Sequence, residues 1–251
     1  GRLWCANGFP SGSKQLFMID KYTGDITNTF FFPDANLHHE YRFVSDWLED
    51  GSGNFLFGTL QGVYYFNTSS HQWKKYSLGA LKGTGQENEM IFSLCLDPVS
   101  PDSILWAGTN GFGLKRLNRV TGNIVVYDIT NGLPNNVIYG IESDHRNNLW
   151  LSTNNGLCLF DPVNLTFKQF KESDGLQSAE FNRYAHLKMK DGTLLFGGVN
   201  GLNYFNPENF YSQNPNSATV ITGLKFYNQE VGVAEKIKNR VVLENPIEYS
   251  N

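Results

Sequence analysis

The chain has 251 residues, of which 40% are hydrophobic and 14% aromatic, enough apolar material for a sizeable buried core. Its 20 Lys and Arg residues are dispersed among 24 Asp and Glu residues, and the formal net charge is −4. Because no basic stripe is present, we expect no direct contact with nucleic acid. No run approaches the roughly 18 apolar residues that cross a bilayer, so we expect no membrane segment within this chain.

One short segment recurs along the chain at intervals of 44 to 52 residues. Its best copies are LWAGTNG at 105–111 and LWLSTNNG at 149–156, and FLFGTLQG at 55–62 is a weaker copy. Equivalent positions are Asn7, Thr59, Thr109, Thr153 and Gly198. Recurrence at such a period indicates one supersecondary unit that has been copied several times.

Each complete copy contains four short apolar or alternating runs separated by polar turns, a pattern typical of strands joined by hairpins. Four-stranded antiparallel sheets repeated at this period pack face to face around an axis. We therefore predict an all-β fold: a β-propeller of four-stranded blades, with five blades or partial blades that belong to a larger ring. The predicted copies are residues 1–43, 44–90, 91–136, 137–180 and 181–215.

The first and fifth copies differ from the middle ones. Arg2-Leu3-Trp4 matches the second strand of a blade, and after Phe205 the fifth copy lacks a clear fourth strand. One residue of the second strand in each copy is expected to pack between neighbouring sheets. These residues are Trp4, Leu56, Trp106, Trp150 and Leu195.

Beyond residue 215 the pattern changes. The runs 218–228 and 240–247 look like strands but do not fit the repeat. We predict that residues 216–251 begin a second, β-sandwich-like module.

The three cysteines, Cys5, Cys95 and Cys158, lie in strand runs of three different copies. An odd number cannot pair completely within one chain. The simplest interpretation is three buried free thiols, and their spacing does not fix their redox state.

Three aspartates, Asp50, Asp97 and Asp144, lie 47 residues apart at the same point of the repeat, between the first and second strands. A pair of catalytic carboxylates needs two unlike environments, so that their pKa values separate. Copied aspartates share one environment and indicate a repeated turn. We therefore assign them a structural role.

The best ligand-binding candidates lie where the fifth copy departs from the repeat. They are Glu180, Asn182, Arg183, Tyr184 and His186. Such a group can hydrogen-bond a polyhydroxylated ligand, with Tyr184 as a stacking face. The alternative is a loop that only joins two blades.

Two long connections between copies, 31–43 and 79–90, are further candidates, because either can frame the mouth of a pocket. The first contains His38, His39, Tyr41 and Arg42, and we include Tyr41 and Arg42 among the predicted ligand residues.

No catalytic or metal-binding motif is found. The histidines, His38, His39, His71, His145 and His186, lack the partner spacing of a metal site. No Gly-x-Ser-x-Gly motif and no glycine-rich phosphate loop before a helix is present. We predict no catalytic residues, no metal and no cofactor, and hence no enzymatic activity for this part of the protein.

Residues 132–170 carry a more specific pattern: Leu133-Pro134-Asn135, a strand ending at Asp144, Leu149-Trp150, Thr153, Gly156-Leu157 and Phe160-Asp161-Pro162. This order resembles the two-component regulator propeller repeat, which all five copies fit to some degree. The fifth copy is similar to the final blade of the sensor region in hybrid two-component systems. Residues 216–251 resemble the start of the immunoglobulin-like module that follows those propellers.

The resemblance implies a periplasmic ligand-sensing region whose intact protein continues into a membrane helix, a histidine kinase, a receiver and DNA-binding parts that regulate transcription. Sensors of this family typically respond to oligosaccharides and work as homodimers, which implies a glycan ligand and a second copy as partners. The family motif is structural, so it assigns no ligand residue. Two other functions stay open: a propeller glycoside hydrolase or lyase, and a protein-binding scaffold.

Overall fold

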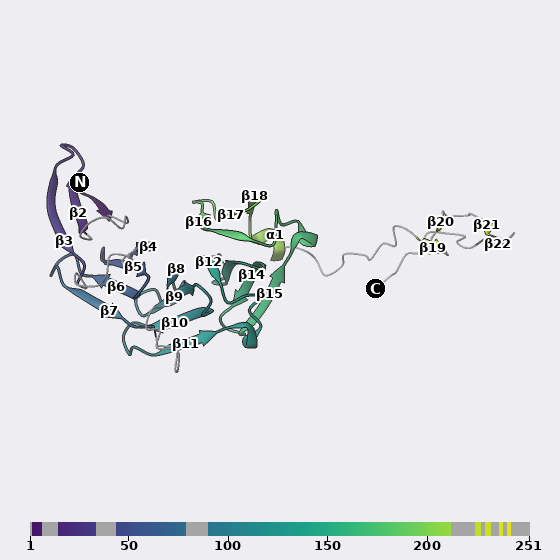
Figure 1. Cartoon of the computed structure of the whole chain (residues 1–251), viewed down its shortest axis with the longest axis horizontal. Coiled ribbons are helices and arrows are strands. Elements are labelled where there is room, and N and C mark those ends of the chain that lie inside the picture. Colours follow the sequence, from purple (N-terminus) through teal and green to yellow (C-terminus); the bar gives the residue numbers. More distant parts are fainter. Residues whose placement is uncertain are drawn as a thin grey trace. The chain divides into compact units, whose positions relative to one another are not determined.

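The computed structural model describes residues 2–6, 15–33, 44–78 and 90–211, and the backbone of four short strands between residues 224 and 241 (Figure 1). Contacts between Cα atoms divide the chain into two units, Gly1–Asn206 and Pro207–Asn251. Unit 1 holds the first four predicted copies and the first part of the fifth, which was predicted to extend to residue 215.

Unit 1 consists of antiparallel sheets in which consecutive strands are neighbours. The first sheet has three strands, β1 (Arg2–Ala6), β2 (Gln15–Asp20) and β3 (Ile26–Phe31). The second has four, β4 (Val44–Glu49), β5 (Phe55–Thr59), β6 (Gly62–Phe66) and β7 (Trp73–Tyr76). The third also has four, β8 (Ile91–Leu96), β9 (Ile104–Thr109), β10 (Leu114–Asn118) and β11 (Ile124–Tyr127).

The last two sheets repeat the pattern. The fourth sheet has four strands, β12 (Ile138–Ser143), β13 (Leu149–Thr153), β14 (Gly156–Asp161) and β15 (Thr166–Phe170). The fifth has three, β16 (Phe181–Lys188), β17 (Leu194–Gly198) and β18 (Gly201–Phe205). Short 3-10 turns precede the fourth and fifth sheets, η2 (Ile129–Asn131) and η3 (Glu172–Asp174). The predicted all-β propeller fold is confirmed, and within the described residues the first and fifth sheets have three strands each.

The first strands of successive sheets lie side by side. Strand β4 contacts β8, β8 contacts β12, and β12 contacts β16. In Figure 1 these strands lie on the inner side of unit 1, while β7, β11 and β15 lie on the outer side. A side chain on an inner strand can therefore meet side chains from several sheets.

The second-strand residues form the packing between sheets, as predicted for most of them. Leu56, Trp106 and Trp150 are completely buried, and Trp4 is half-buried. The Trp106 ring meets Phe160 of the next sheet edge to face, with the ring centroids 5.6 Å apart. Leu195 is less buried than predicted. It is only half-buried, because within the described residues no sheet follows β18 to cover it.

The repeated aspartates hold turns and, in two sheets, also the buried tryptophan. Asp97 Oδ1 accepts hydrogen bonds from the backbone N–H groups of Val99 and Ser100, while its Oδ2 accepts from Trp106 Nε1 at 2.8 Å. Asp144 accepts in the same way from Trp150 Nε1 at 3.0 Å. A buried indole N–H needs such a partner, so the aspartate satisfies both the turn and the core.

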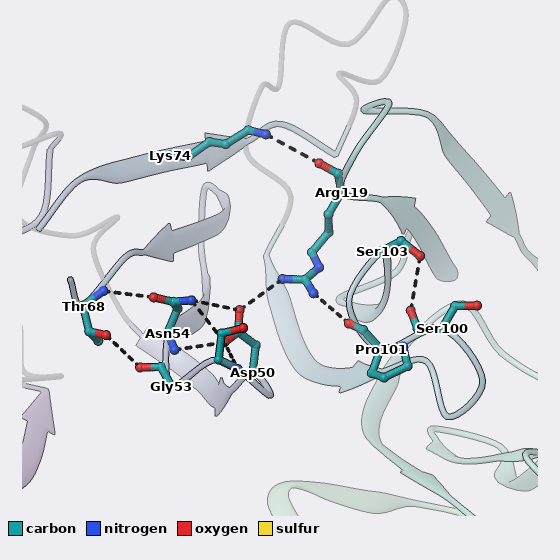
Figure 2. A network of polar contacts seen from close by, with 10 residues as sticks. Asp50, Gly53, Asn54, Thr68, Lys74, Ser100, Pro101, Ser103 and Arg119 are labelled. Atoms are coloured by element: carbon teal, nitrogen blue, oxygen red, sulfur yellow. Dashed lines mark hydrogen bonds and ion pairs between the residues drawn. The ribbon is translucent and has the colours of Figure 1, made fainter. Parts of the chain in front are cut away.

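In the second sheet the turn aspartate, Asp50, contacts an arginine instead of a tryptophan. This sheet has Leu56 in place of the tryptophan, so Asp50 has no indole partner from its own sheet. Instead the guanidinium of Arg119, from the turn after β10, lies 3.7 Å from Asp50 Oδ2 and donates to the Pro101 carbonyl at 2.7 Å. Figure 2 shows this arginine joining the turns of two neighbouring sheets. The structural role predicted for Asp50, Asp97 and Asp144 thus agrees with their contacts.

Two hairpin turns need glycine. Gly62 and Gly156 have φ values of 107° and 88°, a region that L side chains rarely adopt. A Cβ atom at Gly156 would also collide with the carbonyl oxygen of Phe170.

The cysteines are all free, but they are not all buried as expected. Cys158 is buried and Cys95 half-buried, and burial raises the pKa of each thiol to about 12. Cys5 is exposed. Its neighbour Trp4 faces the second sheet, where it meets Phe55, and strand alternation directs Cys5 to the opposite face.

Unit 2 contains a four-residue helix, α1 (Glu208–Tyr211), and two hairpins. Strand β19 (Leu224–Phe226) pairs with β20 (Gln229–Val231), and β21 (Lys236–Ile237) pairs with β22 (Arg240–Val241). The immunoglobulin-like module stays a prediction. No helix within the described ranges is both long and apolar enough to span a membrane.

The bond between Trp106 and Asp97 gives a stability prediction. Trp106→Phe keeps an aromatic ring but removes the N–H donor, and it should lower the free energy of unfolding by about 1–3 kcal/mol. In a double-mutant cycle with Asp97→Ala, measured by urea denaturation, the two changes should be clearly non-additive. Trp47→Phe, at a half-exposed position, is the matched control and should cost less. Strict additivity of the Trp106 and Asp97 changes would contradict this account.

Candidate ligand pocket on the first strands

Each of the first strands carries a register shift near its start. The shifts fall between Val44 and Asp46, Ile91 and Ser93, and Ile138 and Gly140, with a longer irregularity between Phe181 and His186 in β16. A β-bulge re-aims the side chains beside it. Because the four strands are neighbours, polar residues at these shifts are brought together.

Four of these inner residues form a hydrogen-bonded group that we call the polar belt: Asp46, Ser93, Glu142 and His186. Asp46 Oδ2 accepts from the Leu94 backbone N–H at 2.6 Å, which links β4 to β8. Ser93 Oγ accepts from the Ile141 N–H at 3.1 Å, which links β8 to β12.

His186 connects β16 to the rest of the belt. Its Nδ1 lies 2.9 Å from Glu142 Oε1, and its Nε2 lies 3.4 Å from Ser93 Oγ. The imidazole is thereby in contact with the first strands of the third and fourth sheets. This residue holds the fifth sheet to two others through one ring.

A glycine makes room for that ring. A Cβ atom at Gly140 would lie 2.5 Å from the Cγ and Cδ2 atoms of His186 and 2.8 Å from its Cβ. Real Cβ contacts are essentially never so short. Gly140 and His186 therefore form a complementary pair.

The electrostatics of the belt follow from its burial and charge. Burial raises the pKa of Asp46, and the negative charge of Glu142 raises it further, although the Leu94 and Trp47 N–H groups and the charge of His186 oppose the rise. Burial alone lowers the pKa of His186, but the hydrogen bond and charge of Glu142, together with the charge of Asp46, outweigh it and raise the pKa. The imidazolium form is therefore more stable here than in a free histidine.

A pocket of about 270 Å³ opens beside the belt, between residues of β4 and β16. Its walls combine two aromatic side chains with a hydroxyl, a carboxylate and an imidazole. The lining residues are Val44, Ser45, Asp46, Trp47, Tyr184 and His186. Trp47 and Tyr184 are 47% and 51% exposed, so both rings are accessible to a ligand.

Of the predicted ligand residues, Tyr184 and His186 line this pocket. Tyr184 has a φ of 62°, an unusual value for a non-glycine residue, and such strain is often found at functional sites. Arg183 is exposed and places its guanidinium carbon 4.9 Å from the centre of the Phe92 ring and 5.8 Å from that of Tyr184.

The other predicted residues lie outside the pocket lining. Asn182 is exposed on β16, and Glu180 is exposed just before it. Burial raises the pKa of the Tyr139 hydroxyl, and the negative charge of Glu180 raises it further. Tyr41 and Arg42 lie outside the described residues. Their proposed roles stay predictions.

Sequence reasoning missed Asp46, Ser93 and Glu142. A signal was present, because Asp46 and Glu142 each interrupt the apolar pattern of a first strand with a charged residue. Their convergence depended on strand register and on the bulges, which the repeat pattern alone does not give.

The contacts from Ser93 to His186 and from His186 to Glu142 resemble the nucleophile, base and carboxylate of a catalytic triad. However, Ser93 is completely buried and does not line the pocket, and its oxygen already accepts a backbone N–H. It is therefore not placed to attack a substrate. Within the part of the chain that the structure describes, no group of three or more His, Cys, Asp or Glu residues could hold a metal ion.

A second hollow of about 510 Å³ lies against the first and second sheets and includes Arg2, Trp4 and His71. None of its described lining residues is a carboxylate, and none belongs to the polar belt.

Residues 132–155 match the family model of the two-component regulator propeller, which confirms the predicted resemblance at the best copy of the repeat. Histidine kinase P4 of Formosa agariphila is 30% identical over 103 residues, a match that covers 41% of this chain and 8% of that protein.

Two solved structures share the fold. The extracellular domain of BT3049 from B. thetaiotaomicron, assigned to a hybrid two component system, is 21% identical with a TM-score of 0.63, over 93% of this chain and 33% of that one. PorZ of Porphyromonas gingivalis, a surface component of the type-IX secretion system, is 19% identical with a TM-score of 0.61, over 89% and 33%. The chain thus spans about a third of these structures and a small part of the kinase.

The complementary fit of Gly140 and His186 can be tested by stability measurements. Gly140→Ala should lower the free energy of unfolding by about 1–3 kcal/mol, because the new methyl group overlaps the imidazole. His186→Gly removes both the ring and the Cβ atom that lie too close, so Gly140→Ala should cost much less in that background. If the cost is the same in both backgrounds, the proposed contact does not exist.

The raised pKa of His186 gives a second prediction. Because the folded value lies above the ordinary 6.5, the associated stability is fully present below that pH and is lost as the pH rises through the folded pKa. An NMR titration should show the pKa of His186 falling in Glu142→Gln. Glu49→Gln, an exposed change on β4, should leave it unchanged. A pKa that stays the same in both variants would show that Glu142 does not act on this imidazole.

Proposed function

We propose that this chain, which carries the two-component regulator propeller repeat, is the ligand-sensing part of a hybrid two-component signalling protein. Its place is the periplasm, and its ligand is a carbohydrate or oligosaccharide that binds in the pocket between β4 and β16. The intact protein would pass the signal to a histidine kinase and so regulate transcription, with a second copy of the chain as partner. The repeat and the fold shared with BT3049 support this proposal.

The composition of the pocket carries the ligand assignment. Sugar rings present apolar faces and a periphery of hydroxyl groups, so they need both aromatic surfaces and hydrogen-bonding groups. Trp47 and Tyr184 supply exposed rings, and Asp46 supplies a carboxylate. Ser45 and His186 complete the polar part of the lining, with their polar atoms already hydrogen-bonded within the protein. The pocket has a volume of about 270 Å³, at the small end of ligand sites, and so suits part of a longer sugar chain.

The position of the pocket suits a signalling role. Its two walls belong to the second and fifth sheets, while the polar belt links these sheets through Ser93 and Glu142 of the third and fourth. A ligand that contacts both walls has a different affinity for each spacing of β4 and β16. Binding therefore shifts the population of sheet arrangements that the rest of the protein senses.

The binding proposal is tested by calorimetric titration of the complete extracytoplasmic region with a panel of oligosaccharides. For a ligand that binds, Trp47→Ala and Tyr184→Ala should each weaken affinity by about tenfold or more, because buried aromatic contacts dominate such sites. Tyr204→Ala, on the exposed outer strand β18, is the matched control and should leave affinity unchanged.

Absence of binding to every oligosaccharide, with binding to a peptide instead, would contradict the carbohydrate assignment and favour a protein-binding scaffold. Release of reducing sugar during the titration would favour the hydrolase or lyase alternative.

A further inference from the structure

We infer that the ligand of this pocket carries a protonated amino group, which binds against Asp46 between the rings of Trp47 and Tyr184. The inference rests on the proposed function, because it names the chemistry of the ligand for the same pocket. It goes beyond that proposal by distinguishing an amine-bearing ligand from a neutral or acidic sugar.

The first observation is the balance of charge. The polar belt contains two carboxylates, Asp46 and Glu142, and one imidazole, His186. Even with the imidazole protonated, the belt retains one excess negative charge when both carboxylates are ionised. A ligand with one positive charge would complete the balance in a partly buried site, where charge is expensive to leave uncompensated.

The second observation is that His186 is already engaged. Its Nδ1 is 2.9 Å from Glu142 Oε1, and its Nε2 points toward Ser93 Oγ. His186 therefore pairs with Glu142, and its positive charge affects Asp46 only by electrostatic attraction. Asp46 is the carboxylate of the belt that lines the pocket, so it is the one that a ligand can reach.

The third observation concerns the state of Asp46 itself. Its oxygens accept the N–H groups of Leu94 and Trp47 at 2.6 and 2.8 Å, yet burial still raises its pKa. Two amide donors are thus not enough to offset the cost of an ionised carboxylate in this position. A proton relieves that cost in the free protein, and an ammonium group of a ligand would relieve it in the complex.

The aromatic walls favour a cation as well. Trp47 and Tyr184 expose about half of their surface beside Asp46, and the negative faces of such rings attract ammonium groups. Tyr184 already has a cation near it, the Arg183 guanidinium, with its carbon 5.8 Å from the ring centroid. Asp46 shares the pocket lining with both rings, so an ammonium group bound to its carboxylate can also contact an aromatic face.

The experiment compares two sugar chains with the same backbone, one with charged amines and one in which N-acetylation has turned each amine into a neutral amide. A glucosamine trisaccharide and its N-acetylated counterpart are titrated by calorimetry into the extracytoplasmic region at about pH 6, where the free amines keep their protons. The glucosamine trisaccharide should bind at least about tenfold more tightly. Butylamine, titrated separately, distinguishes an amino sugar from an aliphatic amine: weak or no binding assigns the preference to the sugar, and comparable binding assigns it to the amine alone.

Variants localise the effect. Asp46→Asn keeps the shape and one of the two acceptor oxygens but removes the charge, and it should abolish most of the preference for the glucosamine trisaccharide. Glu49→Gln removes one charge from the same strand at an exposed position and should preserve it. Circular dichroism of Asp46→Asn verifies folding, and retained binding of the N-acetylated trisaccharide shows that its pocket is intact.

The outcomes separate this inference from the proposed function. Equal or tighter binding of the N-acetylated trisaccharide overturns the amine inference and leaves carbohydrate sensing in place. A preference that survives in Asp46→Asn also overturns it. If an unrelated neutral or acidic oligosaccharide from the panel binds while neither trisaccharide nor butylamine does, the inference fails and the proposed function stands. If no oligosaccharide and no amine binds, both fail.

Discussion

The arrangement of unit 1 depends on one repeated constraint, the burial of a second-strand side chain against the next sheet. In the third and fourth sheets that side chain is a tryptophan whose N–H must find an acceptor, and Asp97 or Asp144 provides it from the turn before the strand. The bond fixes turn, strand and interface together. Where the second sheet has Leu56 instead, Asp50 takes Arg119 from the neighbouring sheet, so the same turn still contributes to the interface. In the fifth sheet, Met189 stands at the position of the aspartate and Leu195 at that of the tryptophan. Met189 is exposed and Leu195 half-buried, so this part of the sheet is less buried.

A fixed interface on the second strands also fixes where the first strands lie. Their register shifts fall at comparable points, which places Asp46 and Ser93 opposite Gly58 and Gly108 on the adjoining strands. Polar groups that would be isolated on a single sheet then satisfy one another across several sheets. His186 completes this arrangement because Gly140 leaves space for its ring. The repeated interface is thus the scaffold, and residues of the inner strands that differ between copies form the polar belt and line the pocket.

Much of the fold could be predicted from the sequence, because comparing several copies of the repeat removes ambiguities that a single copy would leave. The strand pattern, the incomplete first and fifth sheets and the structural role of the aspartates all follow from comparison of the copies. Tyr184 and His186 were found because the fifth copy departs from the pattern, and both line the pocket. Asp46 and Glu142 were not found, because the residues they face are 44 to 48 positions away and meet only through sheet packing. The exposure of Cys5 was missed for a related reason, since strand alternation decides which of Trp4 and Cys5 faces the second sheet.

The central claim is that a ligand is sensed between β4 and β16, beside the polar belt. The most direct measurement is an NMR titration that follows the imidazole signals of His186 and His71 as an oligosaccharide is added. A saturable shift of the His186 signals is expected, because this residue lines the pocket between β4 and β16, with little change at His71 in the hollow beside the first sheet. Saturable shifts at His71 with His186 unchanged would contradict that claim.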